Sequence, residues 1–293
     1  MISSELLRIR HATVGKVLLG IVLAEAVLIG LLMVFLPNFI DGLIGLNEVI
    51  PNATNADQFT DEQLTGLTLA SPDIQLLVGD VLGNTGLGIS LPVVAATLFG
   101  ALTITGEFRR GSMTNSVLVD PRRVHLILRK LATLISFTTA AAVVLILVRM
   151  MILTIGLAVQ EEPLLAELPE LLAMCGRSII ALVLYTTLGF GIGLLVRSQV
   201  ATLAAVFTAI VVESVIRPLA LLILGGANPT LYLPFGLVPD LSDTTPLAAL
   251  GASAPLSATI SPAAATVTLV LWALLLLGVA TLRFIRTDVP AQA

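Results

Sequence analysis

Six charged side chains lie inside long apolar runs of the sequence, where a charge needs a specific reason to be present. A charge at the bilayer centre costs about 3 kcal/mol on insertion scales, so such residues usually face a bundle interior and pair. Three of the six are acidic and three are basic: Glu25, Asp80, Arg149, Arg177, Glu213 and Arg217. We expect them to form either a structural network that fixes helix register or an outer gate and polar substrate path.

Two of these residues have a spacing that predicts a pair. Glu213 precedes Arg217 by four residues, which places both side chains on one helix face with the acid first. We therefore expect an ion pair between them. Asp80 and Arg177 have a simpler alternative, because their side chains could reach the outer membrane interface by snorkelling.

A second group of charges lies in the segment 106–130, which contains six of the 15 Lys and Arg residues. Gly111 permits a sharp turn, and Asp120-Pro121 is a favourable helix start. Between them, Ser112–Val119 is expected to form a short helix along the membrane surface.

Glu107 can pair with Arg110 or Arg123, which would tie this short helix to the helices on either side. A short, charged and firmly held helix suits contact with a cytoplasmic partner. The alternative is that the Lys and Arg residues only anchor the membrane topology.

No catalytic or metal-binding pattern is present in the sequence. His11 and His125 lack the H-E-x-x-H and metal-ligand spacings, and no G-x-S-x-G occurs. Gly15-Lys16 lacks the rest of a P-loop, so ATP and its Mg²⁺ would have to bind to another polypeptide. We expect a chain that is not an enzyme and binds no metal or cofactor.

The amino-acid composition indicates the environment in which these residues lie. Only 12% of the 293 residues are charged and 57% are hydrophobic, with a mean hydropathy of +1.04. Soluble domains have about 25% charged residues, so this chain cannot supply a polar surface and is expected to lie in a membrane. One cysteine and a net charge of −4 argue against a disulfide-stapled domain and a nucleic-acid binder.

Six apolar stretches reach the length of about 20 residues that a bilayer requires. The sequence therefore predicts an all-α polytopic membrane protein with one domain, 1–293, and no barrel. The expected spans are Val17–Leu36, Ile74–Thr105, Leu131–Ala158, Leu171–Val196, Val200–Leu224 and Pro262–Thr281.

The distribution of charge predicts the orientation, because cytoplasmic segments collect Lys and Arg. The termini and the loops on their side contain 12 of these residues, whereas the three opposite loops contain none and hold 12 acidic residues. Both termini are therefore expected in the cytoplasm. The 13 Arg against 2 Lys suggest a bacterial cell membrane.

Glycines and prolines mark places where these spans can bend or approach one another. The run Ile74–Thr105 is too long for one straight crossing, and Gly83–Gly86 and Pro92 offer breaks. Gly189–Gly193 favours close helix packing. The apolar, proline-rich segment Gly225–Ser261 is expected to re-enter the bundle between the last two spans.

The basic segment resembles a known family. Glu107-Phe-Arg-Arg-Gly-Ser112, followed by Pro121-Arg-Arg123 and Lys130, resembles the pattern E-x-R-x-G-[TS] … P-x-R … K of type-2 ABC exporter permeases. Ser112 stands where Thr is more usual, and His125 where a basic or small residue is common. Shorter stretches of the sequence also resemble this family: Ser4-Glu-Leu-Leu-Arg8, Leu195-Val-Arg-Ser-Gln199, Glu213 and Leu233-Pro-Phe235.

This resemblance implies a permease subunit that moves a hydrophobic or amphipathic substrate such as a drug, lipid or peptide. It also implies a second permease copy or homologue, and a separate cytoplasmic ATPase subunit that binds ATP and Mg²⁺. The residues it assigns to the coupling helix and its flanks are Glu107, Phe108, Arg109, Arg110, Gly111, Ser112, Pro121, Arg122, Arg123 and Lys130.

Two alternatives use the same residues differently. An ion-coupled secondary transporter could use Glu25, Asp80 and Glu213 as titrating groups, although the sequence shows no inverted repeat. A non-transporting scaffold or immunity protein would need the basic loop only to bind a partner.

Overall fold

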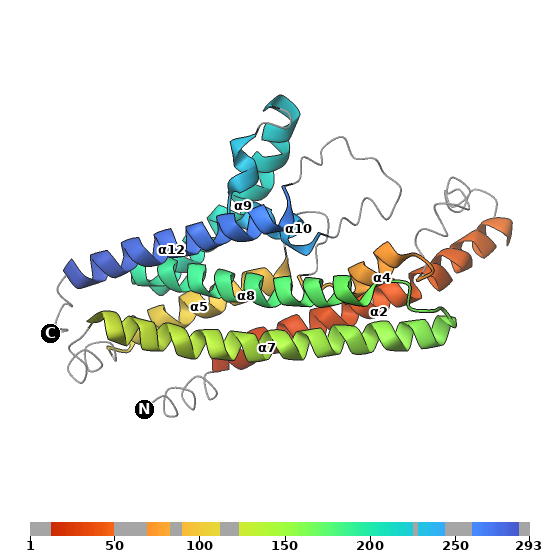
Figure 1. Ribbon diagram of the computed structural model, residues 1–293, viewed down its shortest axis with the longest axis horizontal. Coiled ribbons are helices and arrows are strands. Elements are labelled where there is room, and N and C mark those ends of the chain that lie inside the picture. Colours follow the sequence, from red (N-terminus) through yellow and green to blue (C-terminus); the bar gives the residue numbers. More distant parts are fainter. Residues whose placement is uncertain are drawn as a thin grey trace.

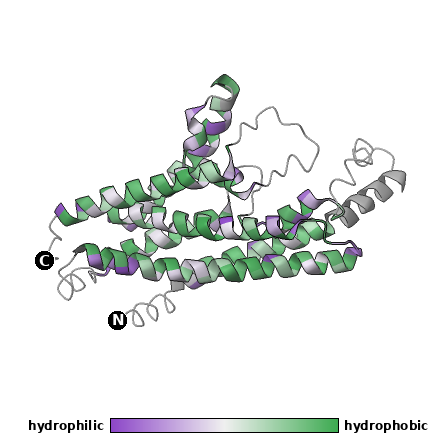
Figure 2. Ribbon diagram, viewed as in Figure 1, coloured by the Kyte–Doolittle hydropathy of each residue, from purple (hydrophilic) through white to green (hydrophobic). Residues whose placement is uncertain are grey.

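The computed structural model describes residues 13–49, 69–82, 90–111, 123–224, 228–243 and 260–286, which are helical and contain no strand. Five long helices run side by side in Figure 1: α2 (Thr13–Val49), α5 (Leu91–Arg109), α7 (Arg123–Gln160), α8 (Leu168–Val196) and α12 (Pro262–Arg286). A sixth, α9 (Gln199–Leu224), stands at a steep angle to them. Apolar residues cover most of each helix in Figure 2.

Six of the described helices are long and apolar enough to cross a membrane, which indicates a multi-pass membrane protein. Five of the predicted spans agree with the structure, with boundaries that differ by up to seven residues. The observed segments are Val14–Phe35, Leu91–Arg109, Val124–Gln160, Leu168–Val196, Gln199–Leu224 and Pro262–Arg286.

The run Ile74–Thr105, for which the sequence offered breaks at Gly83–Gly86 and Pro92, is divided between two helices in the structure. A short helix, α4 (Pro72–Gly79), ends at Asp80, whose backbone is extended, and α5 begins only after Ser90. Both residues cap the break: Asp80 Oδ1 accepts the Leu82 N–H at 2.9 Å, and Ser90 Oγ accepts the Val93 N–H at 3.3 Å. These side chains replace hydrogen bonds that a continuous helix would supply. One helix can therefore end at Gly79 and the next can begin at Leu91 within the same apolar run.

After α9 the chain folds back onto the bundle in three short helices: η2 (Pro229–Tyr232), η3 (Phe235–Leu237) and α10 (Val238–Ser242). Phe235, Leu237 and Leu241 are buried in the same apolar core as Leu182 of α8 and Leu269 of α12. The predicted folding-back of the proline-rich segment is therefore seen for residues 228–243, while 244–259 lie outside the described residues.

The closest helix contact joins α5 and α8 through glycines. A Cβ added at Gly100 would lie 2.0 Å from the Thr186 carbonyl oxygen, and one at Gly189 would lie 1.9 Å from the Thr97 carbonyl oxygen. A Cβ added at Gly193 would lie 2.8 Å from the Ala101 carbonyl oxygen. The two backbones touch, as the Gly189–Gly193 pattern predicted, and α5 and α8 are held together as one unit.

Replacing Gly189 by Ala should lower the free energy of unfolding by on the order of 3 kcal/mol, because the added methyl overlaps backbone rather than a movable side chain. Gly278→Ala in α12 is the matched control, since its Cβ meets nothing within 4 Å. Unfolding of both variants in mixed micelles, followed by circular dichroism, measures the difference. Equal stability of the two would contradict the close contact.

Candidate functional site

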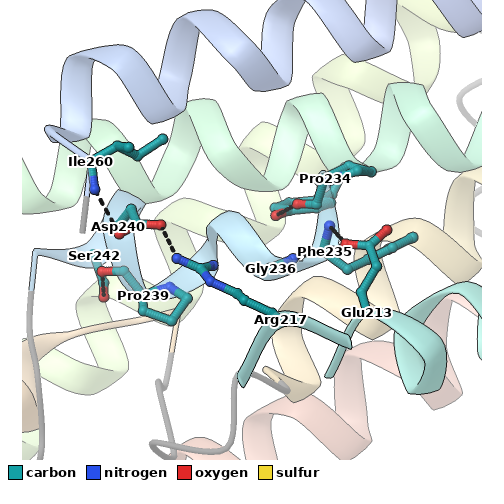
Figure 3. Close-up of polar contacts among 10 residues, drawn as sticks. Glu213, Arg217, Pro234, Phe235, Gly236, Pro239, Asp240, Ser242 and Ile260 are labelled. Atoms are coloured by element: carbon teal, nitrogen blue, oxygen red, sulfur yellow. Dashed lines mark hydrogen bonds and ion pairs between the residues drawn. The ribbon is translucent and has the colours of Figure 1, made fainter. Parts of the chain in front are cut away.

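A buried ion pair joins α9 to the segment that follows it. Arg217 Nη2 lies 2.6 Å from Asp240 Oδ2, and the Asp240 side chain has no exposed surface. Asp240 Oδ1 also accepts the backbone N–H of Ile260 at 3.3 Å. Burial raises the pKa of the Asp240 carboxyl, and the adjacent Arg217 opposes that shift. Asp240 therefore holds α9, α10 and the start of α12 at one point (Figure 3).

Glu213 binds backbone on the same side of α9. Its Oε2 accepts the N–H groups of Phe235 and Gly236 at 2.7 and 3.0 Å, which caps the start of η3. The predicted Glu213–Arg217 ion pair was wrong, because each side chain has a partner in the returning segment instead (Figure 3). We call Glu213, Arg217 and Asp240 the α9–α10 cluster.

Two aromatic side chains complete this attachment. The buried Tyr185 hydroxyl of α8 donates to the Pro234 carbonyl oxygen at 2.6 Å, and its ring stacks on Phe235 at 6.0 Å. Trp272 of α12 donates its Nε1–H to the Tyr232 carbonyl oxygen at 2.9 Å. Helices α8, α9 and α12 thus all fix the same short segment.

Arg177 reaches the far end of α10. Its Nη2 lies 3.9 Å from Asp243 Oδ2 and 3.5 Å from the Ser242 carbonyl oxygen. The side chain is one quarter exposed, so it lies at the edge of the bundle. This position suits a tie between α8 and the returning segment.

A second group of charges, Glu25, Asp80 and Arg149, lies between α2, α7 and the end of α4. Arg149 Nη2 is 3.6 Å from Glu25 Oε1, and the Arg149 side chain is only 2% exposed. Asp80 is fully buried and acts electrostatically on both. Gly30 of α2 packs closely on α7 nearby, because a Cβ there would lie 3.0 Å from two side-chain carbons of Ile152. We call this group the central cluster.

A third group lies where α5 ends and α7 begins. Glu107 Oε2 lies 2.6 Å from Lys130 Nζ, with side chains 7% and 6% exposed. This pair joins α5 to α7, the role that was expected of a pairing with Arg110 or Arg123. Gly111 has φ 66°, so it ends α5 with the turn that the sequence predicted.

The other coupling residues are only partly described. Arg109 and Arg110 are exposed, and Arg123 is the first residue of α7. The predicted helix Ser112–Val119, together with Pro121 and Arg122, lies outside the described residues.

Phe108 packs against a residue that the sequence did not single out. Its ring meets Phe284 of α12 edge-on at 6.3 Å, and the Arg197 guanidinium lies over both rings at 5.9 and 5.8 Å. Arg197 ends α8 with φ 61°. Burial lowers the pKa of Arg197, and the neighbouring Arg283 adds to this shift.

A family model described as "Protein of unknown function (DUF2705)" matches residues 76–290, which is more than half of the chain. The chain belongs to the DUF2705 family. The comparison with curated proteins gave no match. The DUF2705 match starts within α4, so it includes the α9–α10 cluster and Glu107–Lys130, while Glu25 lies before it.

Within the described part of this DUF2705 chain, no group of three or more His, Cys, Asp and Glu side chains could hold a metal ion. The ion pairs instead tie helices to one another. Asp240 and Tyr185 are the main residues that sequence reasoning missed. The sequence offered a sign of the role of Asp240, because it is an acid within a proline-rich apolar segment. No feature of the sequence pointed to Tyr185.

Replacing either Arg217 or Asp240 by Ala should cost about 3–5 kcal/mol of unfolding free energy, because each change leaves a buried charge without its partner. The double variant Arg217→Met/Asp240→Leu should recover much of that loss. Unfolding in mixed micelles measures all three.

The control for these variants is Ser214→Ala, because Ser214 is only half-buried on α9 and its hydroxyl donates within its own helix. Its stability should match that of the unchanged protein. A second double variant, Arg217→Ala/Asp240→Ala, closes the cycle: a loss of stability equal to the sum of the two single losses would contradict a direct Arg217–Asp240 interaction.

Proposed function

We propose that this DUF2705 protein is the membrane-spanning permease subunit of a type-2 ABC exporter in a bacterial cell membrane. The observation that carries the proposal is the buried Glu107–Lys130 ion pair, 2.6 Å long, at the two ends of the basic segment 106–130. A force applied to that segment would reach α5 and α7 together. The proposed partner that contacts this segment is a separate ATPase subunit that binds ATP and Mg²⁺.

The packing beyond the ion pair supports the same role. Because Gly100 and Gly189 bring the backbones of α5 and α8 into contact, movement of α5 would carry α8 with it. Tyr185, one turn before Gly189, and Arg177, nearer the N-terminus of α8, hold the returning segment. The chain therefore has a continuous mechanical path from the basic loop to residues 228–243.

In this proposal the termini and the basic loop face the cytoplasm, and η2, η3 and α10 re-enter the membrane to close the outer mouth. Two permease copies, or a copy and a homologue, would enclose a path for a hydrophobic or amphipathic substrate. ATP binding would press on the coupling helix, and the α9–α10 cluster would separate or shift to release substrate.

Glu107→Gln and Lys130→Gln should each reduce ATP-driven export about tenfold while the ATPase subunit still co-purifies, since each removes one partner of a buried pair. The charge-swapped variant Glu107→Lys/Lys130→Glu should recover part of the activity. Transport into inverted vesicles and ATP hydrolysis, measured on the same preparation, test for uncoupling.

Ser136→Ala is the matched control, because Ser136 lies on α7 but is exposed and donates within its own helix. It should export like the unchanged protein. Failure to co-purify any ATPase would refute the ABC proposal, and normal coupling in both single variants would refute the role of the ion pair.

The second candidate is an ion-coupled secondary transporter, which the central cluster favours because it places two carboxylates and one guanidinium inside the bundle. Export driven by an ion gradient without ATP would decide for this candidate. Partner binding without transport of either kind would decide for a scaffold.

A further inference from the structure

The ends of α5, α8 and α12 meet at an arginine that has no acidic partner. Arg197 directly follows α8, and its guanidinium lies over the rings of Phe108 and Phe284 at 5.9 and 5.8 Å. The three helices end at the same end of the bundle in Figure 1. Among the described residues, no carboxylate forms an ion pair with Arg197. Its charge therefore faces only two aromatic rings.

The N–H groups of this guanidinium also lack acceptors. Arg197 Nε and Nη2 are buried and donate to none of the described residues. A buried donor that belongs to a charged group is costly to leave without an acceptor. Nη1 keeps exposed surface, so a ligand can reach the guanidinium there. Because Nη1 and Nη2 share one edge of the group, a small rotation would let one ligand accept from both.

The backbone of Arg197 does not explain why an arginine is present. Its φ is 61°, a left-handed conformation that Gly adopts most readily at the end of a helix. The Arg197 N–H donates to the Gly193 carbonyl oxygen at 2.9 Å and closes the last turn. Glycine would make the same turn without strain. A strained residue of this kind points to a role for its side chain.

The surroundings of Arg197 favour an anion that a lipid carries. Arg197 follows a helix that can span the membrane, which places it near the lipid headgroups. Nearby apolar side chains are exposed: Val200 at the start of α9 is 77% exposed, and Leu282 of α12 is 56% exposed. Arg283 adds positive potential at Arg197, although Arg283 has further contacts of its own. Two neighbouring arginines attract a phosphate but repel the ammonium of a choline headgroup.

We propose that Arg197 binds the phosphate of an anionic phospholipid in the adjoining leaflet. Nη1 and Nη2 donate to two phosphate oxygens, the bidentate geometry that suits a guanidinium. The rings of Phe108 and Phe284 hold the guanidinium in place, and the acyl chains contact the exposed apolar side chains beside it. This lipid ties the ends of α5, α8 and α12 to the membrane surface. The site does not depend on the proposed export function.

Native mass spectrometry of the full chain in detergent micelles tests the site. The chain is titrated with dioleoyl phosphatidylglycerol or with dioleoyl phosphatidylcholine, which have the same acyl chains. The first phosphatidylglycerol should bind about tenfold more tightly than the first phosphatidylcholine, because only its headgroup has a net negative charge. Inorganic phosphate at the same concentration should not displace it, since phosphate has no acyl chains.

Three variants and one matched control locate the effect. Arg197→Gln should weaken phosphatidylglycerol binding about tenfold, to the level of phosphatidylcholine. Arg197→Gly should do the same while it relieves the left-handed backbone. Arg197→Lys keeps the charge without the paired donors, so it should lose only about threefold. Arg286→Gln removes an exposed charge from the last turn of α12 and should leave the binding unchanged.

Equal binding of the two lipids would overturn the proposal, as would an equal loss in Arg286→Gln and Arg197→Gln. Displacement by inorganic phosphate would overturn the lipid as the ligand. Circular dichroism and elution volume show whether each variant is folded, and Arg197→Gly keeps the test decisive if Arg197→Gln does not fold. A chain that binds phosphatidylglycerol through Arg197 but co-purifies with no ATPase would refute the exporter function and leave the lipid site standing.

Discussion

Backbone groups that are released where a helix stops inside the bundle must find new partners, because lipid offers none. The returning segment and the break after α4 both depend on this constraint. Glu213 accepts two N–H groups at the start of η3, Asp240 accepts one at the start of α12, and Asp80 accepts one after α4. Three of the acids in or near the membrane therefore accept hydrogen bonds from backbone N–H groups. These hydrogen bonds explain why the acids are buried, without any catalytic role.

Gln75 applies the same principle without charge. It has no exposed surface, and its amide donates to the Leu69 and Pro163 carbonyl oxygens at 2.7 and 2.9 Å. Its carbonyl oxygen accepts the N–H groups of Leu165 and Ala166 at 2.8 and 3.0 Å. One neutral side chain thus holds α4 against the connection between α7 and α8, so this connection has a fixed position against α4.

The sequence predicted the helical bundle well because span length and hydropathy follow directly from the bilayer. It also predicted the turn at Gly111 and the close packing at Gly189, since a residue without a Cβ is what a left-handed turn and a backbone contact both require. It failed where partners come from distant segments. The four-residue spacing paired Glu213 with Arg217 because that rule considers one helix alone, and only the fold brings Asp240 and the η3 backbone to α9. A break in the run Ile74–Thr105 was expected, but the capping roles of Asp80 and Ser90 at its two sides were not.

The glycine contact between α5 and α8 limits how this protein can change during evolution. Gly100 meets α8 beside Thr186, and Gly189 meets α5 beside Thr97, so the two helices are in register at both points. A single-residue insertion in either helix would rotate the following residues by about 100° and place side chains where backbone now touches backbone. Lengths of α5 and α8 should therefore be far more constant among relatives than the length of the loop between α5 and α7.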